Sequence, residues 1–94
     1  MRFTEIDPII SAWANENRLP IATHYREEEV RSVELANEDG HRYQIWLDPI
    51  DSDHVVHVHA WDYRRRRVDF TASPNELMAT LNRTLNIVKE WMNG

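Results

Sequence analysis

Cysteine is absent from the 94 residues of this chain. Its absence excludes disulfide bonds and thiolate chemistry, and it makes the cytoplasm the expected compartment. No apolar run reaches the length of a membrane-spanning helix, and the residues that follow Met1 lack the layout of a signal peptide. We therefore expect a cytoplasmic protein with no membrane partner.

Internal repeats, low-complexity segments and linkers are also missing, and the length suits one modest core. We therefore treat residues 1–94 as a single domain. Hydrophobic residues make up 41% of the chain and charged residues 29%, which is ordinary for a globular protein. The formal net charge of −5 argues against general binding of nucleic acid, because such binding requires neutralisation of phosphates.

The common catalytic motifs are missing as well. The chain has no Gly-x-Ser-x-Gly sequence, no phosphate-binding loop and no metalloprotease helix motif. Asp48, Asp51 and Asp53 crowd one connection, but Pro49 and Ile50 do not fit the pattern of a calcium-binding loop. We expect a protein that is not an enzyme and that carries no cofactor.

A first helix is predicted near the start of the chain. Asp7 followed by Pro8 marks its beginning, with Asp7 as the expected cap and Thr4 as the rival cap. The helix should end near Asn17, because Pro20 restricts the residue before it to extended geometry. Its apolar stripe consists of Ile6, Ile9, Ile10 and Trp13.

A second helix is predicted at the other end of the chain. Ser73 should cap it, Pro74 takes its first position, and Glu76 completes a capping box. The helix should run to Asn93. Its apolar stripe consists of Leu77, Leu81, Leu85, Val88, Trp91 and Met92.

Between the helices, hydrophobic and polar residues alternate as they do in strands. The predicted strands cover residues 30–36, 42–47, 54–63 and 67–70, whereas residues 19–28 suit either a strand or a loop. The third strand decides which face of the sheet is buried. Val56, Val58 and Ala60 share one of its faces, and His57, His59 and Trp61 share the other. Because unpaired imidazoles are costly to bury, the valine face should point inward.

Loop lengths then set the pairing of the strands. A three-residue loop over residues 38–40 keeps apolar residues on one face and puts Gly40 where a left-handed residue is needed. Turn-rich residues 48–53 should form the second connection, and Arg64–Arg66 the third. The expected partners are Leu35 with Tyr43, Leu47 with His54, and Ala60 with Phe70.

These elements predict an α+β fold. Four strands form an antiparallel β-meander, and the N- and C-terminal helices pack on one of its faces in the order α-β-β-β-β-α. Two helices side by side are about as wide as four strands, so they can cover that face completely. The fold is therefore a two-layer sandwich whose other sheet face meets water.

The wet face gathers several large aromatic side chains. Tryptophan, tyrosine and arginine are common anchors of protein interfaces, so we interpret this face as a surface that binds a protein partner or a second copy of the chain. The competing interpretation is that these side chains cover one another, or that the start of the chain folds across them. The candidate binding residues are Trp46, His57, His59, Trp61, Tyr63 and Arg67.

An alternative function rests on the His57-x-His59 pair. Two imidazoles on one strand face can share a metal ion if a neighbouring strand adds ligands. The only carboxylate that we expect nearby on that face is Glu34. The alternative is therefore a domain that binds a small ligand or a metal through His57 and His59, with catalysis left open. The run Arg64–Arg67 is typical of a solvated hairpin, although it could also hold phosphate or RNA.

Overall fold

A computed structural model of the protein describes residues 3–20 and 30–93. The chain forms α1 (Asp7–Glu16), β1 (Arg31–Ala36), β2 (Arg42–Leu47), β3 (Val56–Trp61) and β4 (Arg67–Ala72). A short 3₁₀ turn, η1 (Pro74–Glu76), then leads into α2 (Leu77–Asn93). The predicted order α-β-β-β-β-α is confirmed. The choice between strand and loop for residues 21–28 lies outside the described residues.

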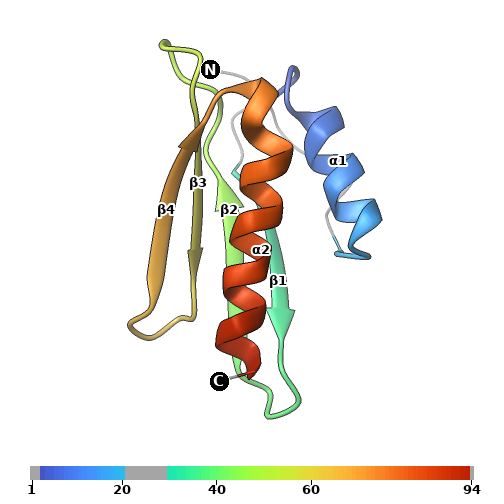
Figure 1. Ribbon diagram of the computed structural model, residues 1–94, viewed down its shortest axis with the longest axis vertical. Coiled ribbons are helices and arrows are strands. Elements are labelled where there is room, and N and C mark those ends of the chain that lie inside the picture. Colours follow the sequence, from blue (N-terminus) through green and yellow to red (C-terminus); the bar gives the residue numbers. More distant parts are fainter. Residues whose placement is uncertain (1–2, 21–29, 94) are drawn as a thin grey trace.

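The four strands form one antiparallel sheet in the order β1-β2-β3-β4, and both helices lie on the same side of it (Figure 1). α2 packs along the sheet, chiefly over β3 and β4, and α1 packs beside α2. The core lies between these two layers, and the third strand faces it with its small side chains as predicted. The largest fully buried side chains are Trp13, Tyr43, Phe3, Ile6, Ile10, Ile45, Leu47, Leu77, Leu81, Leu85, Val56 and Val58.

The first hairpin follows the predicted register. Leu35 pairs with Tyr43, and Val33 pairs with Ile45. Gly40 has φ +81°, a left-handed conformation that glycine adopts without steric cost. The three-residue loop is therefore confirmed, and it keeps the apolar side chains of β1 and β2 on the helix side.

The predicted register between β2 and β3 is wrong by four residues. Leu47 pairs with Val58 instead of His54, and Ile45 pairs with Ala60. The reason lies in Asp51, whose side chain accepts hydrogen bonds from the amides of Asp53 (2.9 Å) and Val55 (3.0 Å). These hydrogen bonds form a turn over residues 51–55, so β3 starts at Val56 rather than at His54.

The predicted register between β3 and β4 is wrong by two residues. Ala60 pairs with Val68 instead of Phe70, and the amide of Asp62 donates to the carbonyl of Arg66 across a three-residue loop. The loop is therefore residues 63–65 rather than Arg64–Arg66. Asp62 causes the shift, because its carboxylate accepts the amides of residues 64–66 and so tightens the turn.

Both shifts leave the assignment of faces intact. Side chains alternate along a strand, so a shift by an even number of residues returns each side chain to the same face. Trp46 accordingly lies beside His59, and Gln44 beside Trp61, all of them on the face away from the helices.

The start of α1 differs from the prediction. Ile6 occupies the cap position, where its side chain cannot accept a hydrogen bond, so neither Asp7 nor Thr4 is the N-cap residue. Asp7 lies inside the first turn and instead holds Arg31, with an Asp7 Oδ1 to Arg31 Nε distance of 3.0 Å. Arg31 is buried and also lies over the ring of Phe3. The carboxylate therefore joins α1 to β1. The end of the helix at Glu16, capped by Asn17, is as predicted.

The start of the second helical segment is confirmed. Ser73 and Glu76 form the capping box, with Ser73 Oγ donating to Glu76 Oε1 at 2.9 Å. The first turn is 3₁₀ rather than α, and the α-helix follows from Leu77. Its buried side chains are Leu77, Leu81, Thr84, Leu85 and Val88. Trp91 and Met92, at the end of the predicted stripe, are only half-buried against the core.

Within the described ranges, neither helix combines the length and the apolar composition that crossing a membrane requires.

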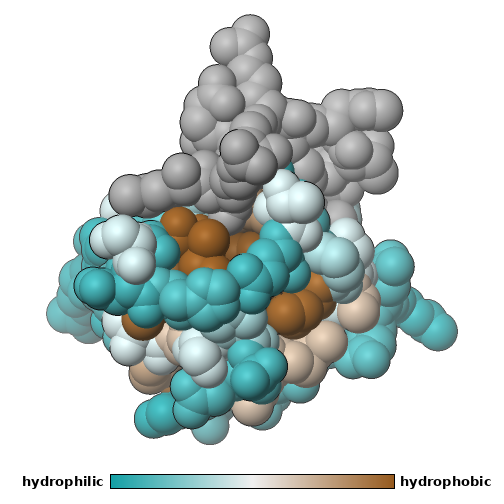
Figure 2. Space-filling view, turned by 90° about the horizontal axis from the view of Figure 1, so that it is seen from above, coloured by the Kyte–Doolittle hydropathy of each residue, from teal (hydrophilic) through white to brown (hydrophobic). Residues whose placement is uncertain are grey.

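Figure 2 views the molecule from the end at which both helices begin. At this end, hydrophobic residues lie in small areas separated by hydrophilic ones. The described surface there offers no broad apolar patch.

Candidate functional site

We use the term open face for the sheet surface that lies opposite the two helices. Alternation along the strands places Trp46 on β2, His57, His59 and Trp61 on β3, and Arg67 on β4 at this face. Tyr63 joins them from the loop after β3, by its contact with Trp61. The structure thus brings together all the candidate binding residues, namely Trp46, His57, His59, Trp61, Tyr63 and Arg67.

These rings form a continuous aromatic row along the open face. Tyr63 lies 4.8 Å from Trp61 between ring centroids, and Trp61 meets Trp46 edge-on at 6.0 Å. Trp46 then stacks on His59 at 4.9 Å, and His59 lies parallel to His57 at 6.4 Å. Aromatic contacts at these separations are favourable beyond the burial of area, so the row is held in place before any partner arrives.

Polar partners fix the tryptophans further. Trp61 Nε1 donates to Gln44 Oε1 at 3.0 Å, so the indole N–H is satisfied within the sheet. Arg67 lies over the ring of Trp46, at 5.3 Å from the guanidinium carbon to the centroid. Both tryptophans are half-buried as a result, which supports part of the competing interpretation that the rings cover one another.

Tyr63 is an exposed member of the row, with 41% of its surface accessible. Its backbone has φ +64°, a region that a bulky side chain rarely adopts. Its hydroxyl donates to Glu34, which also pairs with Arg42. An exposed aromatic ring is therefore held over the sheet from a left-handed turn position, and strain of this kind is concentrated at functional sites.

His59 lies between two carboxylates. Its Nδ1 is 2.6 Å from Asp69 Oδ1 and its Nε2 is 2.8 Å from Asp48 Oδ2, while only 14% of its side chain is exposed. Both ring nitrogens of His59 are thus engaged by carboxylates, so a metal ion would reach the ring only by displacing one of them.

His57 is held differently. Its Nε2 lies 3.1 Å from Asp51 Oδ2, and 42% of its side chain is exposed. In the described part of the chain, no group of three or more histidine, aspartate and glutamate side chains is arranged to hold a metal ion. The geometry of His57 and His59 therefore suits hydrogen bonding better than coordination.

The sequence-based expectation that Glu34 is the only carboxylate near the histidines is wrong. Asp69 faces His59 directly across β3 and β4, and Asp48 and Asp51 reach the histidines from the second connection. Asp69 alternates with Arg67, so the pattern of β4 contained the signal for it. Asp48 and Asp51 carried no such signal, because their positions depend on how the loop folds.

Hydrogen bonds on the open face lower the pKa of several carboxyls. Arg67, and then His59, hold the pKa of Asp69 below its ordinary value. The amide of Val55 is the main reason why the pKa of Asp51 is lowered. These carboxylates remain charged at neutral pH, so the histidine end of the row carries negative charge.

The pKa values at the opposite end of the row are also shifted. The hydroxyl of Tyr63, and then the guanidinium of Arg42, lower the pKa of Glu34. Burial and the hydrogen bond to Glu34 raise the pKa of Tyr63. The tyrosine therefore stays a neutral donor at physiological pH, and its contact with Glu34 persists.

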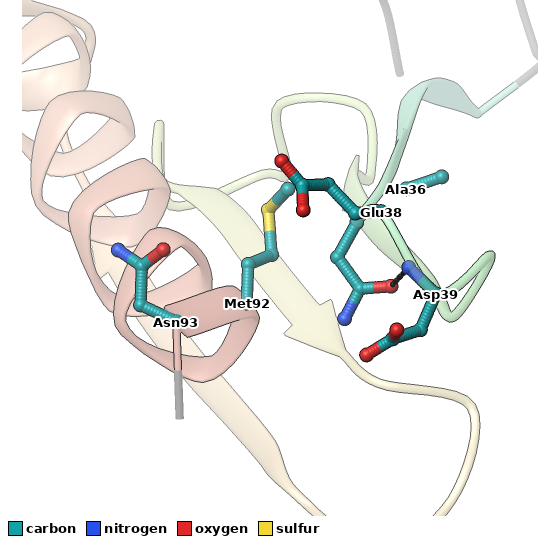
Figure 3. Close-up of a pocket in the computed structure, with 6 residues that line it drawn as sticks. Ala36, Glu38, Asp39, Met92 and Asn93 are labelled. Atoms are coloured by element: carbon teal, nitrogen blue, oxygen red, sulfur yellow. Dashed lines mark hydrogen bonds between the residues drawn. The ribbon is translucent and has the colours of Figure 1, made fainter.

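A hollow of about 480 Å³ lies away from the open face, between the end of α2 and the β1–β2 hairpin. Met92 extends from the helix toward the hairpin, which contributes Glu38 and Asp39 (Figure 3). The amide of Asp39 donates to the side chain of Asn37 and so fixes the hairpin tip. This lining is acidic and polar, and it shows no arrangement of side chains that points to a reaction or to a specific ligand.

No protein-family model, curated protein or solved structure matches this chain. The function is therefore inferred from the geometry of the open face alone.

Proposed function

We propose that this protein is a small interaction module, not an enzyme, that binds a protein partner or a second copy of itself through the open face. The aromatic row carries the proposal. It places two tryptophans on the strands of the open face and an exposed tyrosine at the hairpin end, beside the charge pairs Arg42–Glu34 and Arg67–Asp69. Interfaces are commonly built with aromatic anchors at the centre and polar residues around them.

The hydrogen bonding of the row supports the same function. The rings are held by one another, by Gln44 and by Arg67, so binding would order few side chains. A preordered surface loses less conformational entropy on association than a mobile one does. The absence of cysteine supports a cytoplasmic site of action for this module.

The alternative is that His57 and His59 bind a metal or a small ligand. It is less well supported, because Asp48 and Asp69 engage both ring nitrogens of His59. Only His57 is exposed enough to meet a ligand directly.

Substitution of the row tests the proposal. Immobilised wild-type protein captures candidate partners from the native organism, and the affinity of each purified partner is then measured for Trp61→Ala and Tyr63→Ala. A hot-spot aromatic residue contributes about 2 kcal/mol or more, so Trp61→Ala should weaken binding about 30-fold.

Trp91→Ala is the matched control, because Trp91 is a half-buried tryptophan of α2, in the other layer. It should leave the affinity unchanged. Equal affinity of the wild type and both row variants would contradict the proposal, as would equal loss of binding in Trp91→Ala. Tyr63→Ala keeps the result interpretable if Trp61→Ala is too unstable to assay.

A further inference from the structure

The two hairpin tips lie at the same end of the sheet (Figure 1). A hollow of about 410 Å³ is lined there by His41, Asp62 and residues 64–66. A second hollow, of about 250 Å³, shares His41, Asp62 and Arg64 with it and extends to Tyr63. The concave surface between the tips therefore adjoins the exposed end of the aromatic row.

Most of the arginines near these hollows already have a carboxylate partner. Arg42 pairs with Glu34, Arg66 with Asp62, and Arg67 with Asp69. Arg64 and Arg65 differ, because they form no ion pair with any residue in the described ranges 3–20 and 30–93. Both are exposed. Two guanidinium groups therefore remain available to an anion from outside the chain.

The carboxylate within the hollow does not neutralise them. Asp62 is only 2% exposed, and its oxygens accept the amides of residues 64–66 and the guanidinium of Arg66. Both carboxylate oxygens of Asp62 are therefore occupied within the turn and form no ion pair with Arg64 or Arg65. The outer surface of the turn thus keeps the positive charge of Arg64 and Arg65.

The turn is also rigid. The side chain of Asp62 accepts hydrogen bonds from the amides of residues 64–66. The backbone carbonyl of Asp62 lies 2.9 Å from His41 Nε2 on the neighbouring hairpin. The ring of His41 stacks on Tyr43, with centroids 4.8 Å apart. The backbone that carries the two arginines is therefore fixed before binding, which lowers the entropic cost of association.

On this basis, and resting on the proposed function, we propose that the partner is a protein that presents an acidic peptide segment to Arg64 and Arg65 while its neighbouring residues contact Tyr63 and Trp61. Charge complementarity favours a peptide over a nucleic acid. The far end of the row carries Asp48 and Asp51, which form no ion pair with an arginine or lysine of the described residues and would repel a polyanion that followed the whole face. An acidic segment confined to the hairpin end avoids that repulsion.

Fluorescence anisotropy with three probes tests this inference. The probes are a glutamate-rich peptide with one central leucine, the same peptide with lysine in place of glutamate, and a single-stranded oligonucleotide of matched charge. Each is titrated with the full-length protein at low salt. Each exposed ion pair contributes modestly, so the double variant Arg64→Ala/Arg65→Ala should bind the acidic peptide about tenfold more weakly.

The double variant Arg83→Ala/Lys89→Ala is the matched control, because it removes two positive charges from exposed positions of α2. It should bind the acidic peptide as the wild type does. The acidic peptide should also shift the indole N–H resonance of Trp61. Such a shift would show that a peptide bound at Arg64 and Arg65 also contacts the aromatic row.

Three results would overturn the inference. These are binding of the lysine peptide as tight as that of the glutamate peptide, tighter binding of the oligonucleotide through Arg64 and Arg65, or equal loss of binding in both double variants. If no acidic peptide binds but the affinity of a captured partner still depends on Trp61, the proposed function stands and only the inference about an acidic partner fails. If the peptide binds at the arginines and no partner depends on Trp61, the proposed function fails on its own.

Discussion

Asp62 does more for the local structure than its place beside an arginine run suggests. Burial acts to raise its pKa, but the amide of Arg64, the guanidinium of Arg66 and the amides of Arg66 and Arg65 outweigh burial. Together they lower the pKa of Asp62 to about 2. The charged carboxylate is thus the stable form, and its hydrogen bonds hold a hairpin loop that contains no glycine.

Removal of this side chain should therefore destabilise the protein. Asp62→Ala leaves the amides of residues 64–66 and the guanidinium of Arg66 without their shared acceptor. We expect the free energy of unfolding to fall by about 3 kcal/mol. Urea denaturation of the wild type and the variant measures this difference.

Asp39→Ala is the matched control for that experiment. Asp39 is an exposed aspartate at the tip of the other hairpin, and only its backbone amide takes part in the local hydrogen bonding. This substitution should change the free energy of unfolding by no more than about 0.5 kcal/mol. Equal effects of the two substitutions would show that Asp62 does not hold its turn.

At the scale of elements, the second helical segment depends on its first residues. The amides at the start of a helix lack partners within it, and the capping box of Ser73 and Glu76 supplies them. Ser73→Ala should therefore lower the free energy of unfolding by about 1 kcal/mol. Ser52→Ala, at an exposed turn position, is the control and should have little effect. Thermal unfolding that shifts equally in both variants would contradict the role of the cap.

The elements that could be predicted from sequence are those with signals of their own. The serine, proline and glutamate at residues 73–76 predicted where the second helical segment begins, and Gly40 predicted the loop of the first hairpin. The other two connections could not be placed, because Asp51 and Asp62 act through side-chain hydrogen bonds that depend on the folded loop. Asp7 was assigned as a cap for a similar reason, since its partner Arg31 lies in a distant strand.

At the scale of the molecule, the faces were predicted correctly even where the registers were not. The two-residue period of strands assigns each side chain to one face, and both register errors were even. The aromatic row was therefore found from sequence. Its order from Tyr63 to His57 could not be predicted from sequence, and neither could the aspartates that contact the histidines, because both depend on how side chains pack in the fold.

The whole molecule should lose stability in acid. The pKa values of Asp62, Asp51, Asp69 and Glu34 lie below their ordinary values in the folded state. Each group therefore stabilises the fold above its unfolded pKa, near 4, and loses that contribution as the pH falls through its folded pKa. Urea denaturation should give a free energy of unfolding that declines from about pH 5 to about pH 2.

Asp62→Asn should show a shallower decline over the same range, because the residue with the largest described shift no longer titrates. The buried carboxylate should account for about 2 kcal/mol of the difference between pH 7 and pH 2. A decline that is complete above pH 5, or one identical in the variant, would contradict this assignment.

The meander order has a kinetic consequence. Every strand pairs with its neighbour in sequence, so the sheet assembles by closing three short loops rather than by bringing distant segments together. Folding rates rise as the contacts of a domain become more local. This chain should thus fold faster than sandwiches of similar length whose strands pair across long crossovers, and it should expose its unpaired strand edges only briefly during synthesis.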